Sequence, residues 1–64
     1  MKRNEFLRHL RFHGCILKRE GARHSLYQNP ANGVVETVPR HAEIDNRLAE
    51  KICKRLEIPQ PGKQ

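Results

Sequence analysis

The most constraining feature of this sequence is a set of apolar side chains that recur every fourth residue near its end, at Ile44, Leu48, Ile52 and Leu56. This spacing puts all four on one face of a helix, and Ala49 and Cys53 widen the stripe. Either Asp45 or Asn46 can cap the helix start, and Pro59 is expected to end it. One helix cannot bury such a stripe by itself, so the rest of the chain has to form a layer that covers it.

The length of the chain limits how large that layer can be. A single domain of 64 residues buries only ~60% of the surface that its unfolded chain exposes. Hydrophobic residues make up 36% of the sequence and Trp is absent, so the core has to be thin and built mainly from Leu, Ile and Val. A deep catalytic cleft does not fit such a domain, and any active site is expected at its surface.

A second helix is predicted near the start of the chain. Asn4 can cap its first turn, and Gly14 is a natural stop. Its apolar residues lie at helical spacing. They are Phe6, Leu7 and Leu10.

Between the helices the pattern changes to three short strands, predicted at residues 15–19, 23–27 and 34–38. A Glu-Gly turn joins the first two strands, an Asn-Pro-Ala-Asn-Gly turn joins the last two, and Pro39 closes the third. The predicted fold is α+β in the order α-β-β-β-α. Both helices lie on one face of a three-stranded antiparallel sheet, and the other face is open to water.

Charge and cysteine usage indicate the partner and the compartment. Thirteen Lys and Arg oppose seven Asp and Glu, a formal net charge of +6 that favours nucleic acid or an acidic protein as partner. Cys15 and Cys53 are too few and too far apart for a disulfide scaffold, which fits a reduced cytoplasm. The longest apolar stretch, residues 15–17, is far too short to span a membrane, and the start does not resemble a signal peptide.

His24 is the candidate for chemistry on the second strand. Strand alternation puts His24, Leu26 and Gln28 on one side of the strand, and Arg23, Ser25 and Tyr27 on the other. An imidazole can take a proton from a ribose 2′-hydroxyl near neutral pH, and neighbouring guanidinium groups can stabilise charge on a phosphate. A strand histidine beside arginine is nevertheless more often structural, so these residues alone leave both roles open.

A longer pattern surrounds His24. It begins with the run Gly-Cys-Ile-Leu-Lys-Arg-Glu-Gly-Ala-Arg-His-Ser-Leu-Tyr-Gln-Asn-Pro at residues 14–30 and continues with Val-Pro-Arg-His at residues 38–41 and the final amphipathic helix. This pattern resembles the HicA toxin family over about residues 2–58. Ala22 departs from the Ser of many relatives, and Asn-Arg-Leu at 46–48 departs from their Gly-Thr-Leu.

The resemblance implies a fold like that of double-stranded-RNA-binding domains and a toxin that cuts mRNA without a metal. It also implies a HicB-like antitoxin as partner, with the toxin a monomer when free and a hetero-oligomer with the antitoxin. The family's catalytic histidine falls on His24. No cofactor and no metal are expected, although His9 and His13 have a spacing that could chelate Zn²⁺ with a third ligand.

The remaining site residues are expected to bind RNA. Arg19, Arg23 and Arg40 are candidates to hold the phosphate, and Tyr27 could stack on a base if its ring faces water. Ser25, His41 and Arg47 complete the predicted RNA-binding set. The general acid is left open among His41, a recycled His24 and solvent.

Residues 1–58 are thus predicted to form a single RNA-binding and RNA-cleaving domain, followed by a flexible tail at residues 59–64. The alternative is a basic RNA-binding module without catalytic activity, because a fold does not prove a function.

Overall fold

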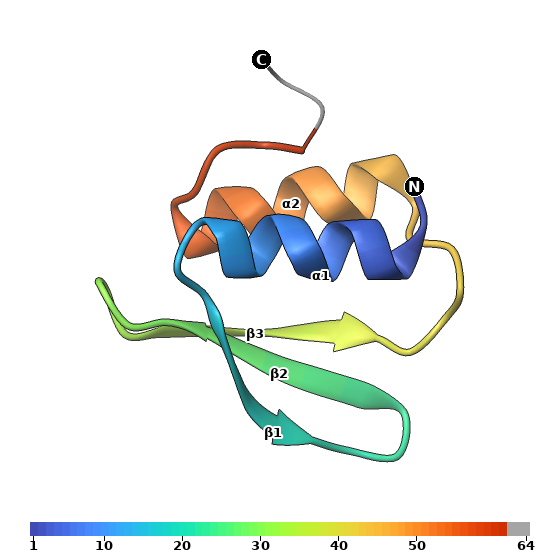
Figure 1. Ribbon diagram of the computed structural model, residues 1–64, viewed down its shortest axis with the longest axis horizontal. Coiled ribbons are helices and arrows are strands. Elements are labelled where there is room, and N and C mark those ends of the chain that lie inside the picture. Colours follow the sequence, from blue (N-terminus) through green and yellow to red (C-terminus); the bar gives the residue numbers. More distant parts are fainter. Residues whose placement is uncertain (62–64) are drawn as a thin grey trace.

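The computed structural model describes residues 1–61 and has the predicted order of elements. These are α1 (Arg3–Phe12), β1 (Ile16–Glu20), β2 (His24–Asn29), β3 (Val34–Pro39) and α2 (Asn46–Leu56). The strands form one antiparallel sheet in the order β1-β2-β3, so β2 is central. Both helices lie on the same side of this sheet (Figure 1). The predicted α+β fold is therefore confirmed, and the arrangement is consistent with a domain of the double-stranded-RNA-binding type.

The two helices start for different reasons. At α2 the side chain of Asp45 accepts a hydrogen bond from the Arg47 backbone N at 3.2 Å, so the cap comes from one of the two predicted residues. The predicted cap of α1 at Asn4 is wrong. That helix already begins at Arg3, where the backbone N donates to Ala42 O at 2.9 Å, and no side chain caps it. A backbone contact with the connection between β3 and α2 thus starts α1.

The other boundaries differ from prediction by one or two residues. β2 runs two residues past its predicted end, to Asn29, and β3 includes Pro39 as its last residue, where an edge strand tolerates proline. α2 ends at Leu56, before Pro59, because Glu57 adopts a left-handed conformation with φ of 61°. At the start of the predicted tail, the Pro59 carbonyl accepts a hydrogen bond from His9 Nε2 at 2.6 Å. The last three residues of the tail, 62–64, lie outside the described range.

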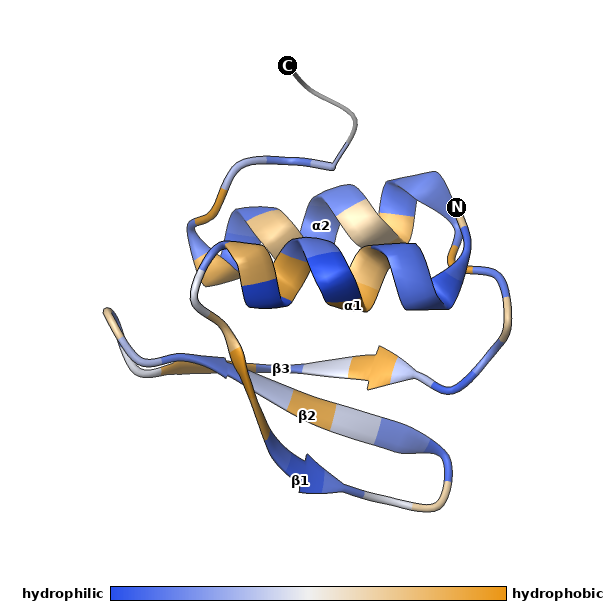
Figure 2. Cartoon of the chain, in the orientation of Figure 1, coloured by the Kyte–Doolittle hydropathy of each residue, from blue (hydrophilic) through white to orange (hydrophobic). Residues whose placement is uncertain are grey.

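The core lies between the helices and the sheet. Apolar and polar segments alternate along both helices, which leaves one apolar stripe on each for the sheet to cover (Figure 2). The buried apolar residues are Phe6, Leu7, Leu10, Cys15, Tyr27, Val38, Ile44, Ala49, Ile52, Cys53 and Leu56. Within residues 1–61 no helix is long and apolar enough to cross a membrane.

Candidate active site

The two faces of β2 separate the predicted site residues. Ser25, Tyr27 and Asn29 point toward the helices and are buried. His24 is exposed, and Leu26 and Gln28 are partly exposed. The predicted alternation is confirmed within β2, whereas Arg23, predicted on the same side as Ser25 and Tyr27, lies before the strand and is exposed. His24 lies on the open face of the sheet, at the first position of the central strand.

The turn before His24 is tight. The Gly21 backbone N donates to the His24 carbonyl O at 2.8 Å. A Cβ built at Gly21 would lie 2.8 Å from that same oxygen, a distance that real side chains essentially never show. Glycine at position 21 therefore lets the turn close directly onto the residue that carries the imidazole.

Arg40 ties this turn to the end of β3. Its Nη1 lies 2.9 Å from Glu20 Oε2 and donates to Gly21 O at 3.0 Å, while its backbone N donates to Arg23 O at 3.2 Å. Glu20 ends β1 and Arg40 follows β3, so these contacts link the segments on both sides of the central strand. The guanidinium predicted to hold phosphate is thus already engaged in fixing the turn.

Ser25 and Tyr27 are corrections to the predicted RNA-binding set. Ser25 is 1% exposed and Tyr27 is 4% exposed, because both point from β2 into the layer beneath the helices. The Ser25 hydroxyl accepts from Arg3 Nη2 at 2.8 Å and donates to Glu20 Oε1 at 3.0 Å. The Tyr27 ring belongs to the core and cannot stack on a base in this fold.

Glu20 and Arg3 are the residues that sequence reasoning missed. Glu20 accepts a hydrogen bond from the Ser25 hydroxyl and forms an ion pair with the Arg40 guanidinium. Arg3 donates from Nε to Pro39 O at 2.8 Å, in addition to its bond to Ser25. Glu20 was assigned to a turn, whereas it ends β1 after a bulge between Leu17 and Arg19 that shifts the register. Unbroken pairing from Leu17 opposite Tyr27 would put Arg19 opposite Ser25, so it is the bulge that brings Glu20 there, and the bulge left no sequence signal.

Two surface hollows adjoin His24. One, of about 220 Å³, is lined by Arg19, Gly21, Ala22, Arg23, His24 and Leu26. The other, of about 400 Å³, is lined by Ala22, Arg23, His24, Arg40 and His41. His24 and Arg23 line both hollows. The structure therefore gathers four other predicted residues, Arg19, Arg23, Arg40 and His41, around the His24 imidazole. Arg47 lies in the first turn of α2 and lines neither hollow.

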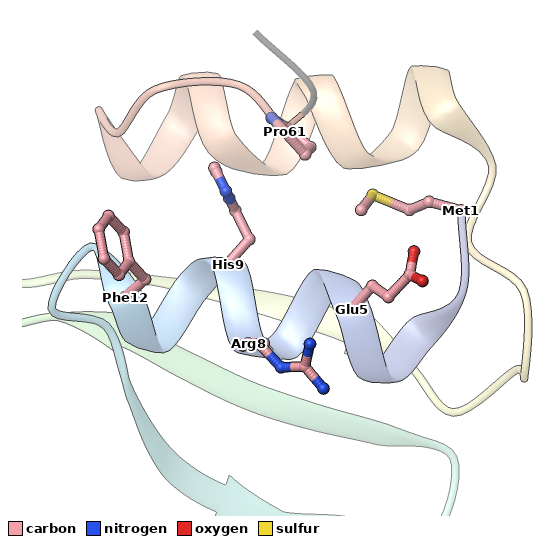
Figure 3. A pocket seen from close by; sticks show the side chains of 6 residues that line it. All are labelled: Met1, Glu5, Arg8, His9, Phe12 and Pro61. Carbon is pink, nitrogen blue, oxygen red and sulfur yellow. The ribbon is translucent and has the colours of Figure 1, made fainter. Parts of the chain in front are cut away.

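A groove on the helix layer has a different character. It is lined by Met1, Glu5, Arg8, His9, Phe12 and Pro61, and Figure 3 shows the α1 side chains along it with Pro61 across from them. Acidic and basic groups both line this groove, and it shares no residue with the two hollows beside His24.

The remaining candidates for metal binding or nucleophilic chemistry are two histidines at α1 and two cysteines. The rings of His9 and His13 lie 4.6 Å apart at their centroids, but the described residues contain no group of three His, Cys, Asp or Glu side chains placed to hold a metal. Cys15 and Cys53 are free and buried. Burial, with a smaller contribution from Cys15, raises the pKa of the Cys53 thiol to about 11, so it stays protonated at neutral pH.

Comparison with known proteins identifies the family. The family model described as the HicA toxin of bacterial toxin–antitoxin systems matches residues 3–58, which include both helices, the sheet and the histidine hollows. Neither the curated proteins nor the solved structures compared with the chain gave a match. Since the match covers nearly the whole chain, this protein belongs to the HicA toxin family.

Proposed function

We propose that this toxin is an endoribonuclease that cuts mRNA, and so inhibits translation and growth, with His24 as its general base. The observation that carries the proposal is the exposure of the His24 imidazole between two hollows lined by arginine. A surface of this kind suits a long, flexible polyanion, which needs no deep cleft. The net charge of +6 adds a general attraction for RNA.

In the proposed reaction His24 takes the proton of a ribose 2′-hydroxyl. The 2′-oxygen then attacks the adjacent phosphorus in line, and the products are a 2′,3′-cyclic phosphate and a 5′-hydroxyl. The nucleophile is part of the substrate, so the reaction requires neither an activated water nor a metal ion. Arg19 and Arg23 are proposed to bind the phosphate as negative charge accumulates on its oxygens.

Arg40 has two proposed roles. It lines the hollow beside His24, and its bonds to Glu20 and Gly21 O hold the turn that carries the histidine. Beyond it, a third hollow of about 510 Å³ is lined by Lys2, Arg3, Asn4, Arg40, Ala42 and Glu43. Because Arg40 lines both, the hollow gives an RNA strand a further basic surface next to the cleavage site. A contact between RNA and Arg47 stays a prediction.

A toxin of this family implies a cognate antitoxin. We propose that the partner is a HicB-like protein that covers His24, that the free toxin is a monomer, and that both act in the cytoplasm. Burial of the imidazole in a hetero-oligomer would block access of RNA to the base. A toxin–antitoxin complex that leaves His24 open to solvent would contradict this mode of inhibition.

The test compares two histidine variants on labelled RNA in the presence of EDTA. Wild type should release products with cyclic phosphate ends, and His24→Ala should lose about 10²-fold to 10⁴-fold in rate, the usual contribution of a general base. His13→Ala is the matched control, because His13 directly follows α1 and lines neither hollow beside His24. Its rate should equal that of wild type.

Two results would contradict the proposal. RNA that is bound but stays intact at high protein concentration would favour a binding module without catalysis. Full activity of His24→Ala would show that another group acts as the base.

A further inference from the structure

We propose that His41 is the second catalytic group of this toxin, the general acid that protonates the leaving 5′-oxygen. The inference rests on the proposed cleavage by His24. It concerns the step that the sequence leaves open among three proton donors, and it assigns that step to one side chain.

The geometric basis is a shared hollow. His24 and His41 both line the hollow of about 400 Å³, together with Ala22, Arg23 and Arg40, and both histidines are exposed. The two imidazoles come from different segments. His24 begins β2, and His41 lies in the connection after β3. A nucleotide in this hollow can therefore meet an imidazole from each of two separate parts of the chain.

The contacts of Arg40 hold these two segments together. Arg40 directly precedes His41, and its guanidinium is bonded to Glu20 and to Gly21 O in the turn before His24. Its backbone N donates to Arg23 O, one residue before His24. The same side chain thus positions the loop that carries His41 and the turn that carries His24.

Other groups in the hollow cannot supply the proton. The guanidinium groups of Arg23 and Arg40 do not lose protons near neutral pH, and Ala22 has no proton to give. The other two histidines lie on α1 or next to its end, and His9 is bonded to the Pro59 carbonyl. His41 is therefore the second imidazole in this hollow, and imidazole is the side chain that most often acts in general acid–base catalysis.

The geometry of in-line attack separates the two proton transfers. The attacking 2′-oxygen and the leaving 5′-oxygen lie on opposite sides of the phosphorus, so one imidazole cannot serve both in the same step. The O2′–P bond forms and the P–O5′ bond breaks. The 2′-hydroxyl proton moves to His24, and a proton from His41 moves to the 5′-oxygen. Exchange with water restores both imidazoles after the cyclic product leaves.

The test uses two short RNAs that differ at one atom, the bridging 5′-oxygen or a sulfur in its place. A thiol has a pKa of about 8.5, so a thiolate leaves without prior protonation, whereas an alkoxide does not. On the oxygen substrate, His41→Ala should be slowed about 10²-fold or more. On the sulfur substrate, it should cleave at nearly the wild-type rate. His41→Gln, which keeps a polar side chain in the hollow, should behave in the same way.

His24→Ala separates the failure modes, because the sulfur substrate still needs a base. It should be slow on both substrates. If His41→Ala cleaved the oxygen substrate at the wild-type rate, the assignment of the acid would be overturned. An equal loss of rate by His41→Ala on both substrates would overturn it too. A wild-type protein that cleaves neither RNA would instead overturn the proposed function itself.

Discussion

The two faces of β2 differ in almost every physical respect. On the inner face, Ser25 and Asn29 are buried with their polar atoms bonded. The Asn29 amide donates to Leu56 O at 2.8 Å, and its carbonyl accepts from the Ala31 backbone N at 3.0 Å. On the outer face, His24 is exposed, and the Gln28 amide reaches Gly33 O at 3.4 Å. Residues that adjoin in the sequence therefore have opposite tasks: the inner ones stabilise the fold and the outer ones are available to a ligand.

Among variants that test the difference between the two faces, one at Tyr27 should have the largest effect on stability. Tyr27→Ala should lower the free energy of unfolding by about 3–5 kcal/mol, because it removes a buried ring from a thin core. Leu26→Ala, the neighbouring change on the outer face, should cost about 1 kcal/mol or less. Urea unfolding of both variants measures the difference. Equal losses would show that the two faces of the strand are equally packed.

A second test concerns the buried Cys53 thiol, in the core between the helices and the inner face of the sheet. The raised pKa of the Cys53 thiol, from 9.0 to about 11, means that the unfolded chain loses this proton first as pH rises. The contribution of this thiol to the free energy of unfolding is fully present below pH 9 and is lost between pH 9 and 11. The loss is on the order of 2 kcal/mol. The measurement is the free energy of unfolding of wild type against Cys53→Ala across this range. Parallel pH curves for the two proteins would mean that the thiol is not desolvated.

The buried amide at the end of β2 should have an intermediate effect. Asn29→Ala removes a donor to Leu56 O and the acceptor for Ala31 N, so it should cost about 1–2 kcal/mol. Gln28→Ala, one residue earlier on the outer face, should change stability by less than about 0.5 kcal/mol. Thermal unfolding of the pair checks this contrast, and a larger loss in Gln28→Ala would reverse it.

The smallest predicted effect concerns RNA binding on the outer face, and it is expected at Arg23. If Arg23 contacts one phosphate, Arg23→Ala should reduce the slope of log affinity against log salt by about 0.7 for single-stranded RNA. Titrations with 2′-O-methyl RNA measure binding alone, since that RNA lacks the attacking hydroxyl. Lys51→Ala, an exposed cation of α2, is the control and should leave the slope unchanged. The same slope change in both variants would indicate diffuse attraction instead of a phosphate contact beside His24.

The sequence predicted the elements and the alternation of β2, because hydrophobic periodicity and turn residues are local signals. It could not decide which side of β2 faces the helices. Leu26 and Tyr27 are both suited to a core, and the choice depends on how the helices cover the sheet. Tyr27 was therefore misjudged as a possible RNA contact although its alternation was predicted correctly.

The contacts that hold the turn beside His24 could not be predicted from the sequence for a similar reason. Arg3 and Arg40 are far from Glu20 in the chain, and they meet it, directly or through Ser25, only after α1 and the sheet have assembled. The misplaced Asn4 cap has the same origin, since α1 starts where its backbone meets Ala42. His24 itself could be proposed from the sequence, because a family motif surrounds it.

The measurement that tests the division of β2 most directly is the response of methyl groups to uncleavable 2′-O-methyl RNA. Leu26 lines a hollow beside His24, whereas Val38 is buried near the same end of the sheet and points toward the helices. The NMR signals of the Leu26 methyls should shift strongly on RNA binding, and those of Val38 should hardly move. Shifts confined to the helix layer, at Leu48 or Ile58, with Leu26 unaffected would contradict the account.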